Sequence, residues 1–281
     1  MLNKNIETFI GCDKSFDESK FVLFGVPFDS TTSYRPGTRF ASKYVRSESY
    51  SIETYSPYQD RDLCDINVFD AGDLELCIGD TQSALKKVES FVVDLLKAEK
   101  IPAMVGGEHL VTLPAISAMQ KKYNDLHVIH FDAHADLRDD FLGNKLSHAT
   151  VMRRVWEILG DKRIYQFGIR SGDKSEFIWA TNHVYMQKFN FDNLEKAVDA
   201  LKGKPVYLSL DLDVLDPSVF PGTGTPEAGG VSFDDLLNAL ISLTELNIVG
   251  FDIVELSPPY DTSGVSVAVA CKLLREVLLI V

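Results

Sequence analysis

The sequence predicts an α/β fold built from repeated βαβ units around a parallel sheet. Short runs of β-branched and aromatic residues alternate with longer amphipathic segments along the 281 residues, which is the pattern of such units. Clustered polar residues follow several of the runs, at the position where parallel sheets hold their ligands. No repeat period, low-complexity tract or polar linker divides the chain. Residues 1–281 are therefore expected to form a single domain.

Six short segments are expected as strands because each is rich in Val, Ile, Phe, Tyr or Leu and is bounded by turn residues. In chain order they are 21–28, 101–107, 127–134, 163–170, 206–213 and 248–256.

Six longer segments between them are expected as helices. In 81–100, for example, Leu85, Val88, Val92 and Leu96 recur at spacings of three and four, so one face is apolar. Pro102 follows that segment and prevents its continuation. The expected helices are 81–100, 110–122, 148–159, 192–202, 231–246 and 264–280.

The composition excludes several classes of protein. The chain is 45% hydrophobic and 25% charged, which is typical of a folded globular protein and excludes disorder and collagen. Its formal net charge of −13 repels nucleic acid and anionic membranes and tolerates cationic ligands. We therefore expect no nucleic-acid or membrane partner.

The cysteines and the amino-terminal segment indicate a cytoplasmic protein. The four cysteines lie far apart and form no CxxC pair, so neither a zinc ribbon nor a redox dithiol is indicated. The first twenty residues lack the apolar core of a signal peptide, and no stretch reaches the length of a membrane span.

Three expected strands end in polar clusters that packing does not explain. The clusters are GGEH at 106–109, DAHAD at 132–136 and DLD at 211–213. Because side chains alternate in extended chain, Asp132, His134 and Asp136 can share one side. On its own GGEH is typical of a turn; the combination indicates a site. His127 and His130 lie inside a strand and are expected to be hydrogen-bonded core histidines, and His183 is given no role.

The charge of these clusters calls for cations. Four aspartates brought together would repel one another, and burying them unpaired is costly. Two divalent ions balance that charge, and His109 and His134 add neutral nitrogen ligands. Aspartate and histidine without thiolate favour Mn²⁺ or a similar ion over structural zinc.

The same motifs resemble those of a known enzyme family. GGEHL, HFDAHADLR and SLDLDVLDPSVFPGTGTPEAGG, followed by DIVELSPPYD, are similar to the motifs of the ureohydrolases, the family of arginase, agmatinase and their relatives. The resemblance runs from residue 34 to the DIVEL strand. It implies a single three-layer α/β/α domain with a central, mostly parallel sheet, and hydrolysis of a guanidinium to urea with two Mn²⁺ ions.

The resemblance also implies a set of metal ligands. One manganese ion would be held by His109, Asp132, Asp136 and Asp211. The other would be held by Asp132, His134, Asp211 and Asp213, so that Asp132 and Asp211 bridge the two ions. This set agrees with the charge balance above.

Further residues receive catalytic roles from the resemblance. Glu255 would pair with the flat guanidinium, and the hydroxyl of Thr225 would lie near the reacting carbon. Asp136 would also relay a proton to the leaving amine. His148 matches a histidine that shuttles protons to bulk water; without the resemblance it would be a helix-start histidine capped by Ser147.

Agmatine, which is arginine without its carboxylate, is the expected substrate, with putrescine and urea as products. Asp139 and Asp140 occupy the region where arginase holds the carboxylate of arginine, and acidic residues there would repel it. Glu227 or Asp173 is expected to receive the distal amine. The resemblance further implies a homo-oligomer, a trimer or hexamer.

Three alternatives stay open at this point. Another ureohydrolase, either an arginase or a guanidino-acid hydrolase, would keep the same metal centre. A zinc deacetylase shares the broad fold but uses one metal, whereas Asp213 and His109 complete a set for two. A binding protein that keeps the metals for stability would not need Glu255 or His148.

Overall fold

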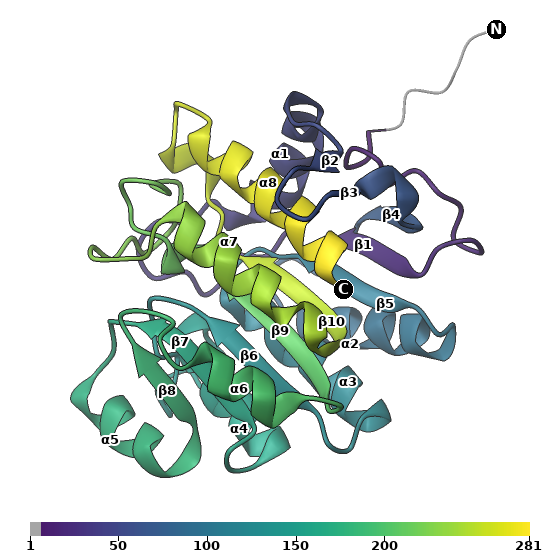
Figure 1. The fold of residues 1–281 in the computed structure, drawn as a ribbon. Helices are drawn as coiled ribbons and strands as arrows, with labels where there is room; N and C mark the ends of the chain where they lie inside the picture. Colours follow the sequence, from purple (N-terminus) through teal and green to yellow (C-terminus); the bar gives the residue numbers. More distant parts are fainter. Residues whose placement is uncertain (1–6) are drawn as a thin grey trace, which may run out of the picture.

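The computed structural model describes residues 7–281, in which a large parallel sheet forms the centre (Figure 1). Within these residues the sheet has eight strands in the order β4-β1-β5-β10-β9-β6-β7-β8, and all its paired strands are parallel. The eight strands are β1 (Phe21–Gly25), β4 (Val68–Asp73), β5 (Ile101–Val105), β6 (His127–Phe131), β7 (Ile164–Ile169), β8 (Tyr185–Lys188), β9 (Pro205–Asp211) and β10 (Asn247–Val254). A separate antiparallel hairpin pairs β2 (Tyr55–Ser56) with β3 (Arg61–Asp62).

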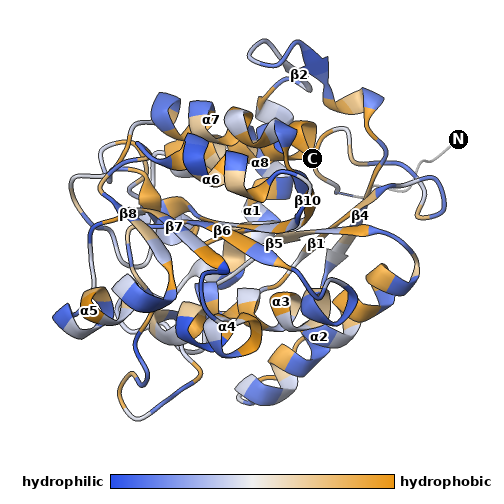
Figure 2. Ribbon diagram, turned by 60° about the horizontal axis from the view of Figure 1, so that its bottom comes forward, coloured by the Kyte–Doolittle hydropathy of each residue, from blue (hydrophilic) through white to orange (hydrophobic). Residues whose placement is uncertain are grey.

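Helices cover both faces of the sheet, as Figure 2 shows with the strands between them. One layer contains α2 (Thr81–Lys97), α3 (Thr112–Lys122), α4 (Val151–Leu159) and α5 (Lys174–His183). The other contains α1 (Ala41–Glu48), α6 (Leu194–Leu201), α7 (Phe233–Ser242) and α8 (Val265–Ile280). The predicted three-layer α/β/α architecture with a parallel central sheet is confirmed.

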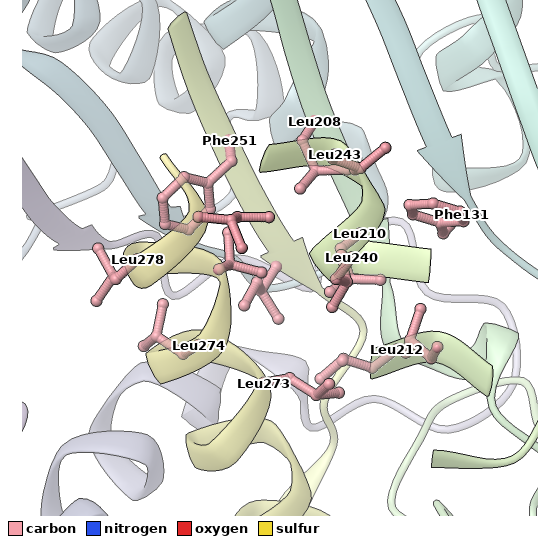
Figure 3. Packing of buried hydrophobic residues seen from close by; sticks show 14 of the residues in the cluster. Phe131, Leu208, Leu210, Leu212, Leu240, Leu243, Phe251, Leu273, Leu274 and Leu278 are labelled. Carbon is pink, nitrogen blue, oxygen red and sulfur yellow. The ribbon is translucent and has the colours of Figure 1, made fainter. Parts of the chain in front are cut away.

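The core between the sheet and α7 and α8 is built mainly from leucine and phenylalanine (Figure 3). Leu208 and Leu210 of β9 and Phe251 of β10 are fully buried, because both strands are covered on their two faces. Close packing of this kind fixes where β9 and β10 end. The packing therefore also fixes the positions of the polar residues that follow these strands.

The observed elements differ from the predicted ones mainly at the edges of the fold. Strands β4 and β8 and helices α1 and α5 were not predicted. β4 and β8 lie at the two edges of the sheet, where a strand needs no continuous apolar run. The predicted strand 127–134 ends at Phe131, because the chain turns at Asp132 into the polar cluster.

No helix among residues 7–281 is long and apolar enough to cross a membrane.

His127, the first residue of β6, is a buried histidine that makes the stability depend on pH. Its side chain lies beside Arg163 and Asp125. Burial lowers the pKa of His127 to about 4, helped by Lys204 and Arg163 and partly opposed by Asp125. The folded protein therefore binds fewer protons here than the unfolded chain, whose histidines have a pKa of about 6.5. Its contribution to stability is complete above pH 6.5 and is lost as the pH falls toward 4.

We expect wild type to lose about 2 kcal/mol more stability than His127→Gln between pH 7 and pH 5, because glutamine does not titrate. Urea unfolding of both proteins at the two pH values measures the difference. His183→Gln is the control, since His183 is partly exposed and pairs with Asp161. Equal losses in wild type and His127→Gln would contradict this account.

Candidate active site

Four neighbouring strands carry the predicted site residues to one edge of the sheet. β5, β10, β9 and β6 lie side by side and run in the same direction, so their carboxyl ends meet. His109 begins a short 3₁₀ turn after β5, Asp132 follows β6, Asp211 ends β9 and Glu255 follows β10. Residues far apart in the sequence are thereby brought together.

Two glycines are required where the chain reaches His109. A Cβ atom at Gly107 would lie 1.7 Å from the carbonyl oxygen of Phe28, and one at Gly106 would lie 2.6 Å from Cγ1 of Val254. Only glycine allows this close approach of backbone to its neighbours. The GG of GGEH is therefore a packing requirement that places the following histidine.

His109 lies at the centre of three carboxylates. Its Nδ1 atom is 3.1 Å from Oδ2 of Asp132 and 3.2 Å from Oδ2 of both Asp136 and Asp211, yet it forms no hydrogen bond with any of them. On the other side of the ring, Nε2 is 2.9 Å from Oγ of Ser209. The hydroxyl of Ser209 donates its proton to Oδ1 of Asp252, 2.8 Å away.

This chain of contacts determines which ring nitrogen of His109 carries the proton. Because the single proton of the Ser209 hydroxyl is used by Asp252, Ser209 accepts from His109 Nε2. In the neutral ring Nδ1 then presents its lone pair to three carboxylate oxygens, and without a metal a proton takes that place. A buried lone pair facing anionic oxygens is unfavourable unless a cation lies among them. The residues present therefore fit a metal ion at this point.

A second group of ligand atoms adjoins the first. Nδ1 of His134 is 3.0 Å from Oδ2 of Asp213 and 3.5 Å from Oδ1 of Asp132. The amide of Asp213 donates to Oδ1 of Asp211 at 2.9 Å. Asp132 thus presents one oxygen to His109 and the other to His134. Asp132, His134 and Asp213 form a group able to hold a metal ion.

His130 orients Asp132 from behind. Its Nε2 atom is 2.9 Å from Oδ2 of Asp132, and its Nδ1 atom accepts from the side-chain amide of Gln166 at 3.0 Å. Because Nδ1 accepts, Nε2 carries the proton and donates it to the carboxylate. His109, His130 and Asp132 also form a group close enough to hold a metal ion, but the protonated Nε2 gives His130 the part of a hydrogen-bond donor.

The pKa values show how poorly this cluster tolerates its own charge. Burial, reinforced by Asp132, raises the pKa of Asp136 to about 7. Burial and the neighbouring Asp213 and Asp132 raise the pKa of Asp211 well above its usual value. Burial opposes protonation of His109, but the surrounding carboxylates prevail and raise its pKa. Protons are thus taken up where cations are needed.

Two site residues have a backbone conformation that is unusual outside glycine. The φ angle is 53° at Asp136 and 63° at Glu255. Such left-handed residues cost free energy and cluster at functional sites, where the surrounding structure holds them. Both turns point a carboxyl group into the same cavity.

A cavity opens over the cluster and is lined by predicted and unpredicted residues. Among them are Thr225, His148 and Glu255, as well as Asp136, Asp211 and Asp213 of the cluster. Oε1 of Glu255 accepts from the amide of His109 at 2.8 Å, and burial together with Glu108 raises the pKa of Glu255. The hydroxyl of Thr225 donates to Oδ2 of Asp213 at 3.4 Å.

His148 lies at a capped turn and also at the cavity. It begins a 3₁₀ turn that Ser147 caps, and its ring also lines the cavity, 3.4 Å from Oγ of Ser33. Its amide donates to Oγ1 of Thr31 at 3.1 Å. Burial and the nearby His134 lower the pKa of His148 to about 4, so its ring is neutral at physiological pH.

A match to a protein-family model decides the relationship of the chain. The model of the arginase family matches residues 19–280. The chain belongs to the arginase family.

Individual relatives within the arginase family are similar over nearly their whole length. An agmatinase of Bacillus cereus is 47% identical over 278 residues, which cover 97% of this chain and 96% of that one. An agmatinase candidate from Clostridium difficile has a crystal structure with 54% identity and a TM-score of 0.92, covering 95% of this chain and 98% of its own. The agmatine ureohydrolase of Thermoplasma volcanium is 35% identical, with a TM-score of 0.89 and 99% and 94% coverage. Membership favours a hydrolase acting on amidines over the zinc deacetylase.

Four residues that the sequence analysis placed near the substrate are not among the described residues that line the cavity. Asp173 caps α5 and pairs with Arg138 at 3.0 Å. The carbonyl oxygen of Glu227 accepts a hydrogen bond from the guanidinium of Arg170. Asp139 pairs with Arg154, and Asp140 accepts from the amide of Gly143 within a turn.

The structure adds lining residues that the sequence did not single out. Arg138, Phe141 and Glu176 line the cavity, and Arg138 lies 3.5 Å from the carboxylate of Glu176. Just behind the site, Glu108 accepts from the amide and hydroxyl of Thr31. Arg138 and Phe141 closely follow DAHAD and Glu108 lies within GGEH, but closeness along the chain does not reveal the direction of a side chain. Glu176 is far from both motifs in the sequence and carried no such signal.

Proposed function

We propose that this chain is a two-manganese agmatinase that hydrolyses agmatine to putrescine and urea. One observation carries the proposal: Nδ1 of His109 faces three carboxylate oxygens, and two of those carboxylates, Asp136 and Asp211, line a cavity that Glu255 also lines. The carboxylate oxygens around His109 require cations, and Glu255 offers a carboxylate to a cationic substrate. The similarity to named agmatinases supports the choice of substrate.

The two ligand sets follow the contacts of the cluster. His109, Asp132, Asp136 and Asp211 would hold one ion, which the distances around His109 Nδ1 support. Asp132, His134, Asp211 and Asp213 would hold the other, supported by the His134 contacts. Mn²⁺ suits such mixed oxygen and nitrogen ligands. When bound, a pair of divalent ions supplies a water nucleophile at neutral pH.

Glu255 and Thr225 would hold the guanidinium. The amide of His109 fixes one oxygen of Glu255, which orients the carboxylate for the fork of guanidinium donors. In the reaction a C–O bond forms between water and the guanidinium carbon, and the C–N bond to the alkyl nitrogen breaks. Both protons of the water pass to the leaving nitrogen, which departs as an ammonium group of putrescine, and the carbon with its new oxygen departs as urea.

Asp136 and His148 would manage the protons. Asp136 lies in the cavity beside the cluster and would pass a proton to the leaving amine. His148 lies on the lining, beside Ser33, and would carry a proton between the cavity and bulk water. A neutral imidazole can accept such a proton and release it quickly.

Glu176 is the better candidate to receive the distal amine. Asp173 and Glu227 lie outside the described lining of the cavity, whereas Glu176 belongs to it. Its oxygens accept from the amides of Leu137 and Asp173 at 2.8 and 2.7 Å, so the carboxylate is held in one orientation. A carboxylate held in this way can still accept from an ammonium group.

One observation favours a second candidate function, a guanidino-acid hydrolase. Arg138 lines the same cavity and could pair with a substrate carboxylate. Its guanidinium already pairs with Asp173 at 3.0 Å and lies 3.5 Å from Glu176. These two carboxylates already balance the positive charge of Arg138. The agmatine proposal is therefore the stronger of the two.

A competition assay decides between them. We expect kcat/KM for agmatine to exceed that for arginine by at least roughly 10²-fold, about 3 kcal/mol, because the carboxylate of arginine would meet the cavity carboxylates. Urea release is measured with added Mn²⁺ from agmatine, arginine, guanidinobutyrate and guanidinopropionate. Glu176→Gln should raise KM for agmatine, and Glu227→Gln is its control.

Preference for any of the carboxylate-bearing compounds would contradict the agmatine assignment and would point to Arg138 instead. Absence of urea from all four compounds, with two ions bound, would support the remaining alternative of a metal-stabilised binding protein.

Other properties of the protein stay predictions. We propose a single catalytic domain over residues 1–281, which the continuous sheet from β1 to β10 supports. A homo-oligomer, a trimer or hexamer, and a cytoplasmic location are expected on the grounds given above.

A further inference from the structure

Arg170, directly after β7, has an unusual set of partners. Its guanidinium donates to the carbonyl oxygens of Asp213 at 2.8 Å, Val214 at 3.0 Å and Leu215 at 3.3 Å. It also donates to the carbonyl oxygen of Glu227, from Nη2 at 2.8 Å and from Nε at 3.2 Å. Among the described residues no carboxylate lies within ion-pair distance of it. Arg170 thus uses its fixed fork of donors on backbone alone.

The carbonyls belong to two separate segments that both reach the site. One is the turn at 213–215, which begins with the predicted ligand Asp213. The other is the loop at 221–230, which carries Thr225. The first end of this loop is held elsewhere, where Gly222 donates to Ser266, and its last residues are held beside the turn, where Gly230 donates to Asp216. Arg170 joins the middle of the loop to the turn.

The backbone of Arg170 is tied to a third segment of the site. Its amide donates to the carbonyl oxygen of Ala133 at 2.7 Å, and the amide of Ser171 donates to the same oxygen at 2.9 Å. Ala133 lies between the predicted ligands Asp132 and His134. The main chain of Arg170 therefore contacts the loop after β6, and its side chain contacts the turn after β9.

A glycine makes this approach possible. Gly168 has a φ of 86°, and a Cβ atom there would lie 2.5 Å from Cγ2 of Val214 and 3.1 Å from the carbonyl oxygen of Asp132. The pairing of β7 with β8 also shifts register between Phe167 and Ile169. The end of β7 is thus shaped to lie against both segments.

We propose that Arg170 is a positioning residue that sets the separation of Asp213 and His134 and holds the Thr225 loop over the centre. This inference rests on the proposed function. Asp213 belongs to one of the two predicted ligand sets only. Loosening its turn should therefore weaken one metal site and leave the site around His109 intact.

Arg170→Lys tests the proposal, because the lysine ammonium keeps the charge but is a single point that cannot reach both segments. We expect affinity for the second Mn²⁺ ion to fall roughly 10- to 100-fold. After dialysis against limiting Mn²⁺, the variant should retain one ion per chain where wild type retains two. The kcat for agmatine should fall with it at limiting Mn²⁺.

Hydrogen exchange of the metal-free protein gives a readout that does not depend on metal or activity. Amides in 213–216 and 221–230 should exchange faster in Arg170→Lys than in wild type. Arg275→Lys is the control: Arg170 is half-buried, whereas Arg275 is buried, donates to the carbonyl of Glu53 and pairs with Glu276. Arg275 lies in α8 outside the site. If Arg170→Lys does not fold, Arg170→Gln is measured instead.

Unchanged metal stoichiometry and unchanged hydrogen exchange in the Arg170 variant would overturn the proposal. An equal loss of bound manganese and an equally faster exchange in Arg275→Lys would also overturn it. If wild type itself binds fewer than two ions or releases no urea, the proposed function fails. The exchange measurement then still decides whether Arg170 joins the two segments.

Discussion

Asp132→Asn is expected to abolish urea release and to reduce bound manganese to less than one ion per chain. Asp132 presents Oδ2 to His109 and Oδ1 to His134, so asparagine removes charge that both ions share. The amide group would also turn a donor toward the amide of His134 or toward His130, which both donate to this carboxylate. Leaving buried donors unpaired costs about 1–3 kcal/mol each.

Asp211→Asn should have a similar effect, since Asp211 faces His109 and also accepts from the amide of Asp213. Metal content by elemental analysis after gel filtration, together with urea release, measures both variants. Asp70→Asn is the matched control, because Asp70 is a buried aspartate paired with Arg46 outside the site. Two tightly bound ions and near-normal turnover in either variant would show that the ligand assignment is wrong.

His148→Asn should lower kcat by roughly 10²- to 10⁴-fold without changing the metal content, because it removes a proton carrier and no ligand. The turn itself should survive, since Ser147 caps it and the amide of residue 148 still donates to Thr31. Added imidazole should restore part of the lost rate. Because the pKa of His148 lies near 4, protonation of His148 should lower kcat near that pH. The acid limb of the profile of kcat against pH is therefore expected near 4 and not near 6.5.

His183→Asn is the control for that experiment, since His183 contacts Trp179 and Asp161 away from the cavity. Steady-state rates with and without imidazole, and manganese per chain, are measured for both variants. Full activity of His148→Asn would leave His148 with its capping role alone.

The sequence predicts the centre of the fold better than its edges. β9 and β10 are buried on both faces, so their residues form continuous apolar runs that are visible without a structure. β8, with the sequence YMQK, is an edge strand whose side chains are half-buried or exposed. In α5 only Glu176 and Ala180 are buried, so no apolar stripe marks that helix.

The candidate ligands were accessible to sequence reasoning for a related reason. Asp132 and Asp211 adjoin or end strongly apolar strands, and the parallel arrangement then brings them together. Arg170 gave no such signal, because its partners are carbonyl oxygens that every residue has. Asp173 follows the lining residue Gly172 along the chain, but Asp173 pairs with Arg138 and does not itself line the cavity.

The predicted ligand positions span about a hundred residues, from His109 to Asp213, and follow or end three strands of the sheet. An unfolded chain therefore keeps together only the ligands of 132–136, and the complete site can form only after β5, β6 and β9 have assembled with β10. Contacts between such distant segments form late in folding. Manganese should then stabilise the native state by mass action. It should slow unfolding while leaving the rate of folding almost unchanged.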